Sequence, residues 1–416
     1  MPPASKPIRA FLLLLLTYVG FISLGLPDGM LGVAWPSMRA QFDLPLDAIS
    51  AVLVVFITGY LISTLSAGWL LARMNVGMLL ALSGAATAVG LIGYATAPAW
   101  GVIVALSFIA GLGAGAIDTG LNTYAAMNYS ARTMNWLHAC YGLGAASGPV
   151  LLTAILASGA PWQRGYFLVG VSELVLVACF LATLSWWPKV SETRELEMEG
   201  KAGEAQPAAS LLSTLKLRTV WLGIVTFFIY TGTEAAVGTW TYTFLTGHHG
   251  IAADRAGNWT AAYWGSLTVG RIAAGLIAGK VTPRALILGG AWIIVLGAIL
   301  IVSGLGATVT ILGIMCIGFG CAPIFPSLIS TTPNRVPLQH TANAVGYQIA
   351  AATLGIALVP SFVGYLGRVQ GLQVIPIAWF VSAAALLVLL MMLLRFAPNP
   401  SAIETRTASS STPSTP

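Results

Sequence analysis

Charged residues are scarce in this sequence, since only 8% of the 416 residues are Asp, Glu, Lys or Arg. In a soluble protein roughly a quarter of the residues are charged. The sequence also lacks a nucleotide-binding loop, a metal-ligand cluster and a nucleophile motif, which argues against an enzyme and against a metal or organic cofactor. The four cysteines lie in apolar segments without metal-binding spacing, so we expect them to be packing residues: Cys140, Cys179, Cys316 and Cys321.

Hydrophobic residues make up 57% of the chain and gather in long continuous runs. A helix of about 20 apolar residues crosses the roughly 30 Å of hydrocarbon in a bilayer. The runs do not alternate with polar residues, which favours helices over a barrel. We predict an all-α integral membrane protein with twelve transmembrane helices, at residues 9–37, 46–71, 76–96, 99–128, 131–158, 162–187, 218–246, 255–281, 284–304, 307–330, 341–366 and 372–396.

The net charge of +6 reflects where the basic residues lie relative to the predicted spans. It does not indicate a nucleic acid partner. Arg39, Arg164, Arg255 and Arg368 lie on one side and Arg271 inside a span, whereas the other 14 of the 19 Lys and Arg residues lie on the opposite side. The positive-inside rule places both termini in the cytoplasm. We expect a monomeric, multi-pass protein of the plasma membrane, or of the inner membrane in a bacterium.

A polar interval divides the chain into two halves. Residues 188–217 are rich in mixed charge and small residues, which predicts a cytoplasmic linker between six-helix halves at 1–187 and 218–397. Residues 398–416 are rich in Ser, Thr and Pro and predict a disordered tail.

Glycines repeat between these halves at one offset of 207 residues. The matching pairs are Gly68 with Gly275, Gly111 with Gly318, and Gly148 with Gly355. Three matches in equivalent spans indicate a duplicated six-helix unit.

Four acidic residues, Asp28, Asp118, Glu173 and Glu234, lie inside predicted spans. A charge in hydrocarbon costs several kcal/mol unless it meets water or a partner, so such residues indicate function. Glu173 has no evident partner in the sequence.

Proton coupling is predicted for Asp118, Asp28 and His138. Asp118 shares a helical face with small residues and Asn122. His138 on the next span lies at a similar depth, which permits a carboxylate–imidazole pair, although a histidine bonded to a backbone carbonyl is the alternative. Asp28 follows Pro27, which loosens the helix and frees a carbonyl group.

Solute binding is predicted where rings, hydroxyls and acids gather, because a sugar offers both C–H faces and hydroxyl groups. The predicted residues are Asn122, Glu234, Trp240, Tyr242, Tyr263 and Trp264. The alternative for the rings is anchoring at the membrane interface. For Arg271 and Arg73 we predict a gating or structural role. Arg271 is placed toward the inner gate, where it pairs with an acid or caps a helix end.

The twelve-span layout resembles the major facilitator superfamily, and more narrowly the fucose:proton symporter group. The resemblance rests on LPDGMLG in the first span, GAGAIDTGLN in the fourth and LHACYGLGAASGP in the fifth. It implies a central cavity lined by the first, fourth, seventh and tenth helices, with proton coupling and sugar recognition at Asp28 and Asp118 and a solute contact at Asn122. Two departures are Ala72, where the superfamily has Asp, and the shorter Asp118, where the group has Glu.

These features predict a secondary transporter that imports a small polar solute, most simply a sugar, together with protons; sodium is the alternative coupling ion. The first alternative function is proton-driven export of a drug or metabolite. A second is a non-transporting sensor or lipid-handling protein on the same scaffold, for which Asp118 would have no role.

Overall fold

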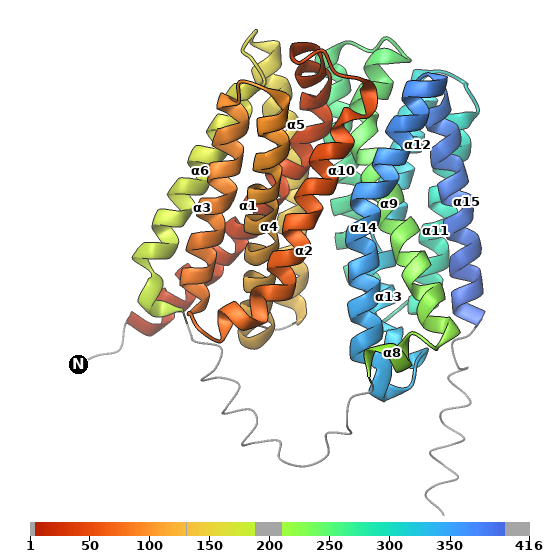
Figure 1. Cartoon of the computed structure of the whole chain (residues 1–416). Coiled ribbons are helices and arrows are strands. Elements are labelled where there is room, and N and C mark those ends of the chain that lie inside the picture. The colour runs from red at the N-terminus through yellow and green to blue at the C-terminus, as the bar shows by residue number, and fades with distance from the viewer. Residues whose placement is uncertain (1–4, 130, 188–209, 396–416) are drawn as a thin grey trace, which may run out of the picture.

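The structure is a computed structural model that describes residues 5–129, 131–187 and 210–395, nearly all of them in helices. The first bundle comprises α1 (Ser5–Gln41), α2 (Ile49–Leu71), α3 (Val76–Thr96), α4 (Trp100–Asn128), α5 (Ala131–Ala157) and α6 (Gln163–Ala182). The second comprises α9 (Arg218–Gly247), α10 (Ala253–Ile277), α11 (Pro283–Val302), α12 (Ala307–Cys321), α13 (Ile324–Ser330), α14 (Thr341–Gln370) and α15 (Val374–Arg395). Figure 1 shows the two bundles standing side by side.

Within the described residues, eleven helical segments are long and apolar enough to cross a membrane, and α12 and α13 together count as one of them. The predicted twelfth, α10, has 25 residues but includes Asp254, Arg255 and Arg271, so it is less apolar than the others. It packs against α5, α9 and α12 and lies between the bundles (Figure 1).

The two bundles repeat one pattern of helix contacts. In the first, α1 packs on α5, α2 on α4, and α3 on α4 and α6. In the second, α9 packs on α14, α10 on α12, and α11 on α12 and α15. The bundles meet where α5 contacts α10, α2 contacts α14 and α1 contacts α9.

The glycines that recur at the 207-residue offset have the same surroundings in both bundles. A Cβ added at Gly148 would lie 2.3 Å from the Leu26 carbonyl oxygen, and one at Gly355 would lie 2.2 Å from that of Phe228. By contrast, nothing lies within 4 Å of a Cβ at Gly68 or at Gly275. Equivalent positions are therefore crowded or open together.

The contact between α1 and α5 is backbone against backbone. A Cβ at Gly25 would lie 2.2 Å from the Tyr141 carbonyl oxygen, and one at Gly29 would lie 2.0 Å from that of Ala145. From the other side, a Cβ at Gly144 would lie 2.1 Å from the Ile22 carbonyl oxygen. Small residues permit this approach, as they do at many membrane helix interfaces.

The predicted linker lies mostly outside the described residues, which resume at residue 210. Its last part, residues 210–217, contains the short helix α8 (Leu211–Thr214), for which the Ser210 side chain is the N-cap. The predicted tail at 398–416 also lies outside the described residues.

Candidate functional site

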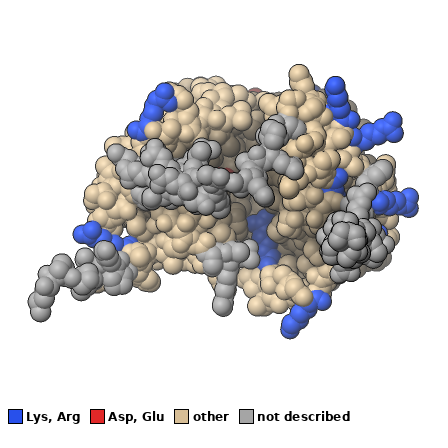
Figure 2. All heavy atoms as spheres, turned by 90° about the horizontal axis from the view of Figure 1, so that it is seen from below, with Lys and Arg blue, Asp and Glu red and all other residues tan. Residues whose placement is uncertain are grey.

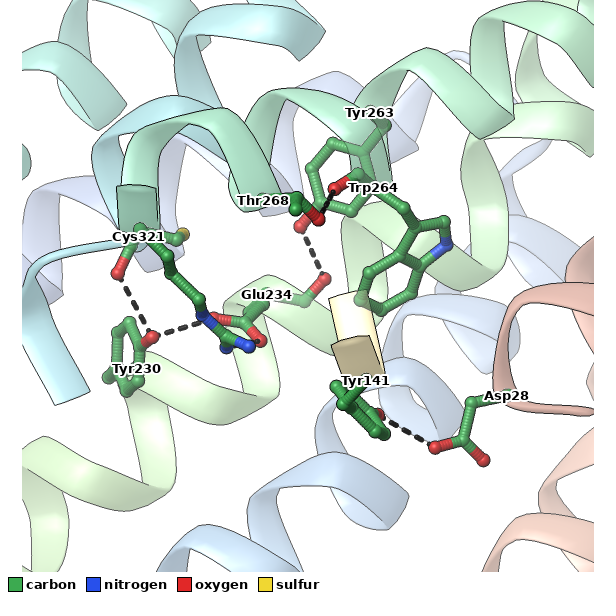
Figure 3. A network of polar contacts seen from close by, with 9 residues as sticks. Asp28, Tyr141, Tyr230, Glu234, Tyr263, Trp264, Thr268 and Cys321 are labelled. Carbon is green, nitrogen blue, oxygen red and sulfur yellow. Dashed lines mark hydrogen bonds and ion pairs between the residues drawn. The ribbon is translucent and has the colours of Figure 1, made fainter. Parts of the chain in front are cut away.

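The second bundle positions Glu234 with an ion pair and a hydrogen bond. Glu234 lies near the middle of α9, and its Oε1 is 3.6 Å from a terminal guanidinium nitrogen of Arg271 on α10. The Tyr230 hydroxyl, one turn earlier, donates to Oε2 at 2.6 Å. The Tyr263 hydroxyl donates to the Glu234 carbonyl oxygen at 2.7 Å (Figure 3). These contacts hold the carboxylate in one orientation.

The first bundle positions Asp28 differently. The Tyr141 hydroxyl on α5 donates to Asp28 Oδ2 at 2.7 Å, and the close α1–α5 approach makes this reach possible (Figure 3). The Asp28 side chain is exposed although it lies deep inside α1. Tyr141 also lies within electrostatic reach of Glu234 and Arg271. The Asp28 and Glu234 groups therefore border the same region between the bundles.

Asp118 on α4 points toward α2. The Tyr60 hydroxyl donates to Asp118 Oδ2 at 2.6 Å, and the Asn122 amide donates to Oδ1 at 2.8 Å and to the Asp118 carbonyl oxygen at 3.0 Å. Asp118 and Asn122 thus form one unit, as their helical spacing predicts.

The structure does not form the expected pair between Asp118 and His138. Among the described contacts, His138 packs edge-on against Phe21, with 5.5 Å between ring centroids, and both Asp118 oxygens are used by Tyr60 and Asn122. The helix α4 packs chiefly against α2 and α3 and has few contacts with α5. Depth alone suggested the pair, and rotation about the helix axis prevents it.

The four predicted aromatic residues have different surroundings. Trp240 is fully buried, and its indole nitrogen donates to the Pro360 carbonyl oxygen at 2.8 Å. It joins α9 to α14 as a packing residue, which corrects the expectation that it binds the solute. Tyr242 is buried beside a cavity of about 260 Å³ at the ends of α5 and α9.

Trp264 and Tyr263 lie closer to the acidic groups. The buried Trp264 Nε1 has no hydrogen-bond partner among the described residues. In Figure 3 its indole is seen between the Glu234 group and the Tyr141–Asp28 pair. This buried N–H is therefore a donor without a hydrogen-bond partner among the described residues. Tyr263, by contrast, is fully buried and uses its hydroxyl on the α9 backbone.

The two predicted gating arginines also differ. Arg271 reaches Glu234 in the middle of α9, so its guanidinium does not lie at the inner gate, where we had expected it. Arg73 is exposed and lies over the Trp69 ring, with its guanidinium carbon 3.8 Å from the ring centroid. No described ion pair includes Arg73, since those described join Arg271 to Glu234 and Arg368 to Asp47.

A hollow separates the two bundles at one end of the molecule, and the bundles are in contact at the opposite end. Figure 2 shows the hollow between the bundles, with Lys and Arg side chains around it. At the other end, Arg368 Nε on α14 lies 3.4 Å from Asp47 Oδ1, just before α2. A Cβ at Gly32 on α1 would lie 2.7 Å from the Thr239 carbonyl oxygen on α9. The bundles are therefore apart at one end and in contact at the other.

Two tyrosines of this site, Tyr60 and Tyr141, were not among the residues predicted from the sequence. Both stand on apolar helices far along the chain from the acids that they bind. A phenol inside a membrane span needs a hydrogen-bond partner, and that is the signal that could have identified them.

A bundle of membrane-crossing helices with acids gathered on an internal surface defines a polytopic membrane transporter and not an enzyme. The sequence model of the Major Facilitator Superfamily matches residues 17–348 and also 222–415. The chain belongs to this superfamily.

Two curated relatives are similar along most of the chain. Bypass of stop codon protein 6 of Saccharomyces cerevisiae is 24% identical over 392 residues, covering 88% of this chain and 78% of the relative. The glucose/mannose transporter GlcP of Bacillus subtilis is 20% identical over 357 residues, covering 84% of this chain and 86% of the relative.

Solved transporters share the fold at low identity. The D-xylose-proton symporter has a TM-score of 0.71 and 14% identity, covering 94% of this chain and 98% of its own. The Escherichia coli fucose:proton symporter has a TM-score of 0.63 and 16% identity, covering 92% and 98%. The nucleoside transporter NupG has a TM-score of 0.68 and 15% identity, with the same coverage.

Proposed function

We propose that this chain is a proton-coupled symporter that carries a small neutral polyol, most simply a monosaccharide, by alternating access. The observation that carries the proposal is the kind of partner that two acids of the first bundle have. Asp28 and Asp118 accept hydrogen bonds from neutral donors, and the described ion pairs belong to other acids. A carboxylate without a fixed cation is free to take up a proton.

Coupling requires that this protonation change with the orientation of the cavity. An acid that faces the outside binds a proton, crosses as a neutral group and releases the proton on the inner side. Neutralisation removes the cost of a charge in a closed, dry site. Asp118 is the principal coupling residue of this scheme and Asp28 the second.

The solute site lies between the bundles, near the midplane, as in transporters built from repeats. Trp264 offers a ring, while Asp28 and Glu234 offer acceptors for hydroxyl groups. Arg271 is already paired with Glu234, so an anionic solute finds less attraction there. The glucose/mannose, D-xylose and fucose transporters among the similar proteins support a sugar.

The decisive experiment measures uptake of labelled monosaccharides into proteoliposomes with an inward proton gradient. We expect accumulation that a protonophore abolishes, with weak affinity on the order of micromolar to millimolar, because each hydroxyl contact contributes about 1 kcal/mol. A matched sodium gradient tests the alternative ion. If no sugar is taken up while lipophilic dyes are expelled in a proton-dependent way, the export function replaces this proposal.

Asp118→Asn should abolish gradient-driven accumulation, because the amide cannot carry a proton, while counterflow exchange of the solute continues. Asp43→Asn is the matched control, since Asp43 lies in the exposed α1–α2 connection and its φ of 50° suits Asn. Undiminished accumulation by Asp118→Asn would remove Asp118 from the mechanism.

The membrane orientation is part of the proposal. With both termini in the cytoplasm, the hollow of Figure 2 opens to the cytoplasm, and the Asp47–Arg368 pair closes the outer end. The expected location is the plasma membrane. Labelling of an introduced cysteine at Lys216 from the inner side only would support this orientation, and labelling from the outside would reverse it.

A further inference from the structure

A small cavity inside the first bundle is lined by two of the acids, Asp28 and Glu173. It is lined by Ser23 and Asp28 from α1, Thr87 from α3, Ile117 from α4 and Glu173 from α6. Its volume is about 20 Å³, and a water molecule requires roughly 10–15 Å³ of such space. The cavity therefore has room for one water.

Two polar atoms on this cavity lack a hydrogen-bond partner among the described residues. They are Glu173 Oε2 and Thr87 Oγ1, and the Glu173 residue is only 1% exposed. The Ser23 hydroxyl lies beside the Glu173 carboxyl group and donates to the Gly20 carbonyl oxygen at 2.9 Å. Buried polar groups are normally satisfied by protein or by water. A water in the cavity would satisfy both orphaned atoms.

The space beside Glu173 is maintained by a glycine. A Cβ at Gly84 on α3 would lie 3.9 Å from Glu173 Oε2 and 2.9 Å from a Val177 methyl group. Any larger residue at Gly84 would occupy the volume next to the carboxyl group. The glycine in α3 thus leaves room beside Glu173 Oε2, which has no hydrogen-bond partner among the described residues.

Among the described residues, no Lys or Arg lines the cavity beside Glu173. From α1 the titratable neighbour is Asp28, which accepts from Tyr141 on α5, and from α3 the polar neighbour is Thr87. Asp118 on α4, which accepts a hydrogen bond from Tyr60 of α2, interacts electrostatically with Asp28. Ionising Glu173 here would bury a charge without a counter-ion, which costs several kcal/mol. Glu173 is therefore held as a neutral acid that carries a proton.

We propose that Glu173 is a further proton-binding residue, in addition to Asp118 and Asp28, and that a single water in this cavity connects it to Asp28. A proton leaves one carboxyl group for the water while the water gives one of its own protons to the other carboxylate. The water is unchanged, and one acid becomes neutral as the other becomes ionised. Thr87 positions the water. This proposal rests on the proposed proton-coupled function, because it supplies the proton store behind Asp28.

Infrared spectroscopy of the protein in lipid tests the proton directly, because a neutral carboxylic acid has its own C=O stretching band. We expect such a band in the wild type at neutral pH, its loss in Glu173→Gln, and a shift on transfer to D2O. Persistence of the same band in Glu173→Gln, or its absence from the wild type at every pH tested, would overturn the proposal.

The route through the cavity is tested by the rate of deuterium exchange at this band. Thr87→Val removes the hydroxyl without changing its size, and Asp28→Asn removes the partner acid; each should slow exchange at least about tenfold, since positioned groups accelerate proton transfer by 10²–10⁴-fold. Ser83→Ala is the matched control, because that buried α3 hydroxyl donates to Leu79 and does not line the cavity. Unchanged exchange in both test variants would exclude the water link.

Transport measurements separate this proposal from the proposed function. If the wild type shows no proton-driven uptake of any solute, the symport function fails, while the band and its exchange still decide whether Glu173 holds a proton. If the wild type does transport, Glu173→Gln should lower gradient-driven accumulation at least about tenfold and leave counterflow within twofold. Full accumulation by Glu173→Gln would overturn its role.

Discussion

The interior acids of the two bundles have different partners. In the first, Asp28 and Asp118 are held by tyrosine hydroxyls, and no cation contacts them among the described ion pairs. In the second, Glu234 also accepts from a tyrosine, but Arg271 lies 3.6 Å away. A phenol fixes the position of a carboxylate and leaves its charge changeable. In the second bundle the Arg271 guanidinium instead places a fixed cation beside the carboxylate.

This difference suggests a division of labour on a duplicated scaffold. Helix packing and glycine positions are repeated between the bundles, whereas the cation at Arg271 in α10 is not: the residue 207 positions earlier, in α2, is Thr64. In the proposed function, the first bundle exchanges the proton and the second holds a fixed pair of charges toward the solute. Three sets of variants test this comparison. They change the Glu234–Arg271 pair, the glycines that are repeated between the bundles, and the Asp47–Arg368 pair that joins the bundles.

The largest effect is expected from breaking the Glu234–Arg271 pair. Arg271→Gln and Glu234→Gln each leave one charge without its partner in a largely buried site, which should cost up to about 3–5 kcal/mol, whereas the double variant should recover part of this loss. Tyr141→Phe in the first bundle removes a neutral hydrogen bond and should cost about 1–2 kcal/mol. Thermal unfolding in detergent measures all four variants. Additive losses in the double variant would show that the pair is not coupled.

A smaller effect is expected at the repeated glycines, where the bundles should behave alike. Gly148→Ala and Gly355→Ala both force a methyl group against a carbonyl oxygen, and each should destabilise by about 1–3 kcal/mol. Gly68→Ala and Gly275→Ala face open space and serve as controls; a gain of up to about 1 kcal/mol is expected from helix propensity. Melting temperatures compare the pairs. Opposite results within a pair would mean that the structural repeat does not extend to stability.

The smallest effect is expected at the Asp47–Arg368 ion pair, which joins the two bundles. The Arg368 side chain is 47% exposed, so Asp47→Asn should weaken the closed outer end by no more than about 1 kcal/mol, a shift of up to about fivefold in population. Labelling of Thr153→Cys, which lines the cavity of about 260 Å³, by a membrane-impermeant maleimide reports this opening. Asp43→Asn is again the control. Equal labelling with and without Asp47→Asn would assign the closure to apolar packing alone.

Much of the fold follows from the sequence because span length is a one-dimensional property. The predicted span 76–96 has the same bounds as α3, and 99–128 differs from α4 by one residue. The break between α12 and α13, at Ala322 and Pro323, is not predicted by hydrophobicity, since it interrupts no apolar run.

The site follows from the sequence only in part, because side-chain contacts depend on rotation about each helix axis. The acids were identifiable since each interrupts an apolar run, and the Asp118–Asn122 contact is local. The tyrosines that bind Asp28 and Asp118 come from other helices and needed the three-dimensional arrangement. Trp240 looked like a solute contact until its indole was seen bonded to α14.

The backbone contact between α1 and α5 also bears on how fast the transporter works. Carbonyl oxygens of each helix lie where the other would carry a Cβ at Gly25, Gly29 and Gly144, so neither helix can slide past the other without separating. The Asp28–Tyr141 pair must then travel as one rigid body, as packed elements do in domain rotations. The slow step of the cycle is left to the seam between the bundles, where α5 meets α10 and α2 meets α14. Turnover should therefore respond to substitutions along that seam and hardly at all to membrane-facing changes elsewhere on α1.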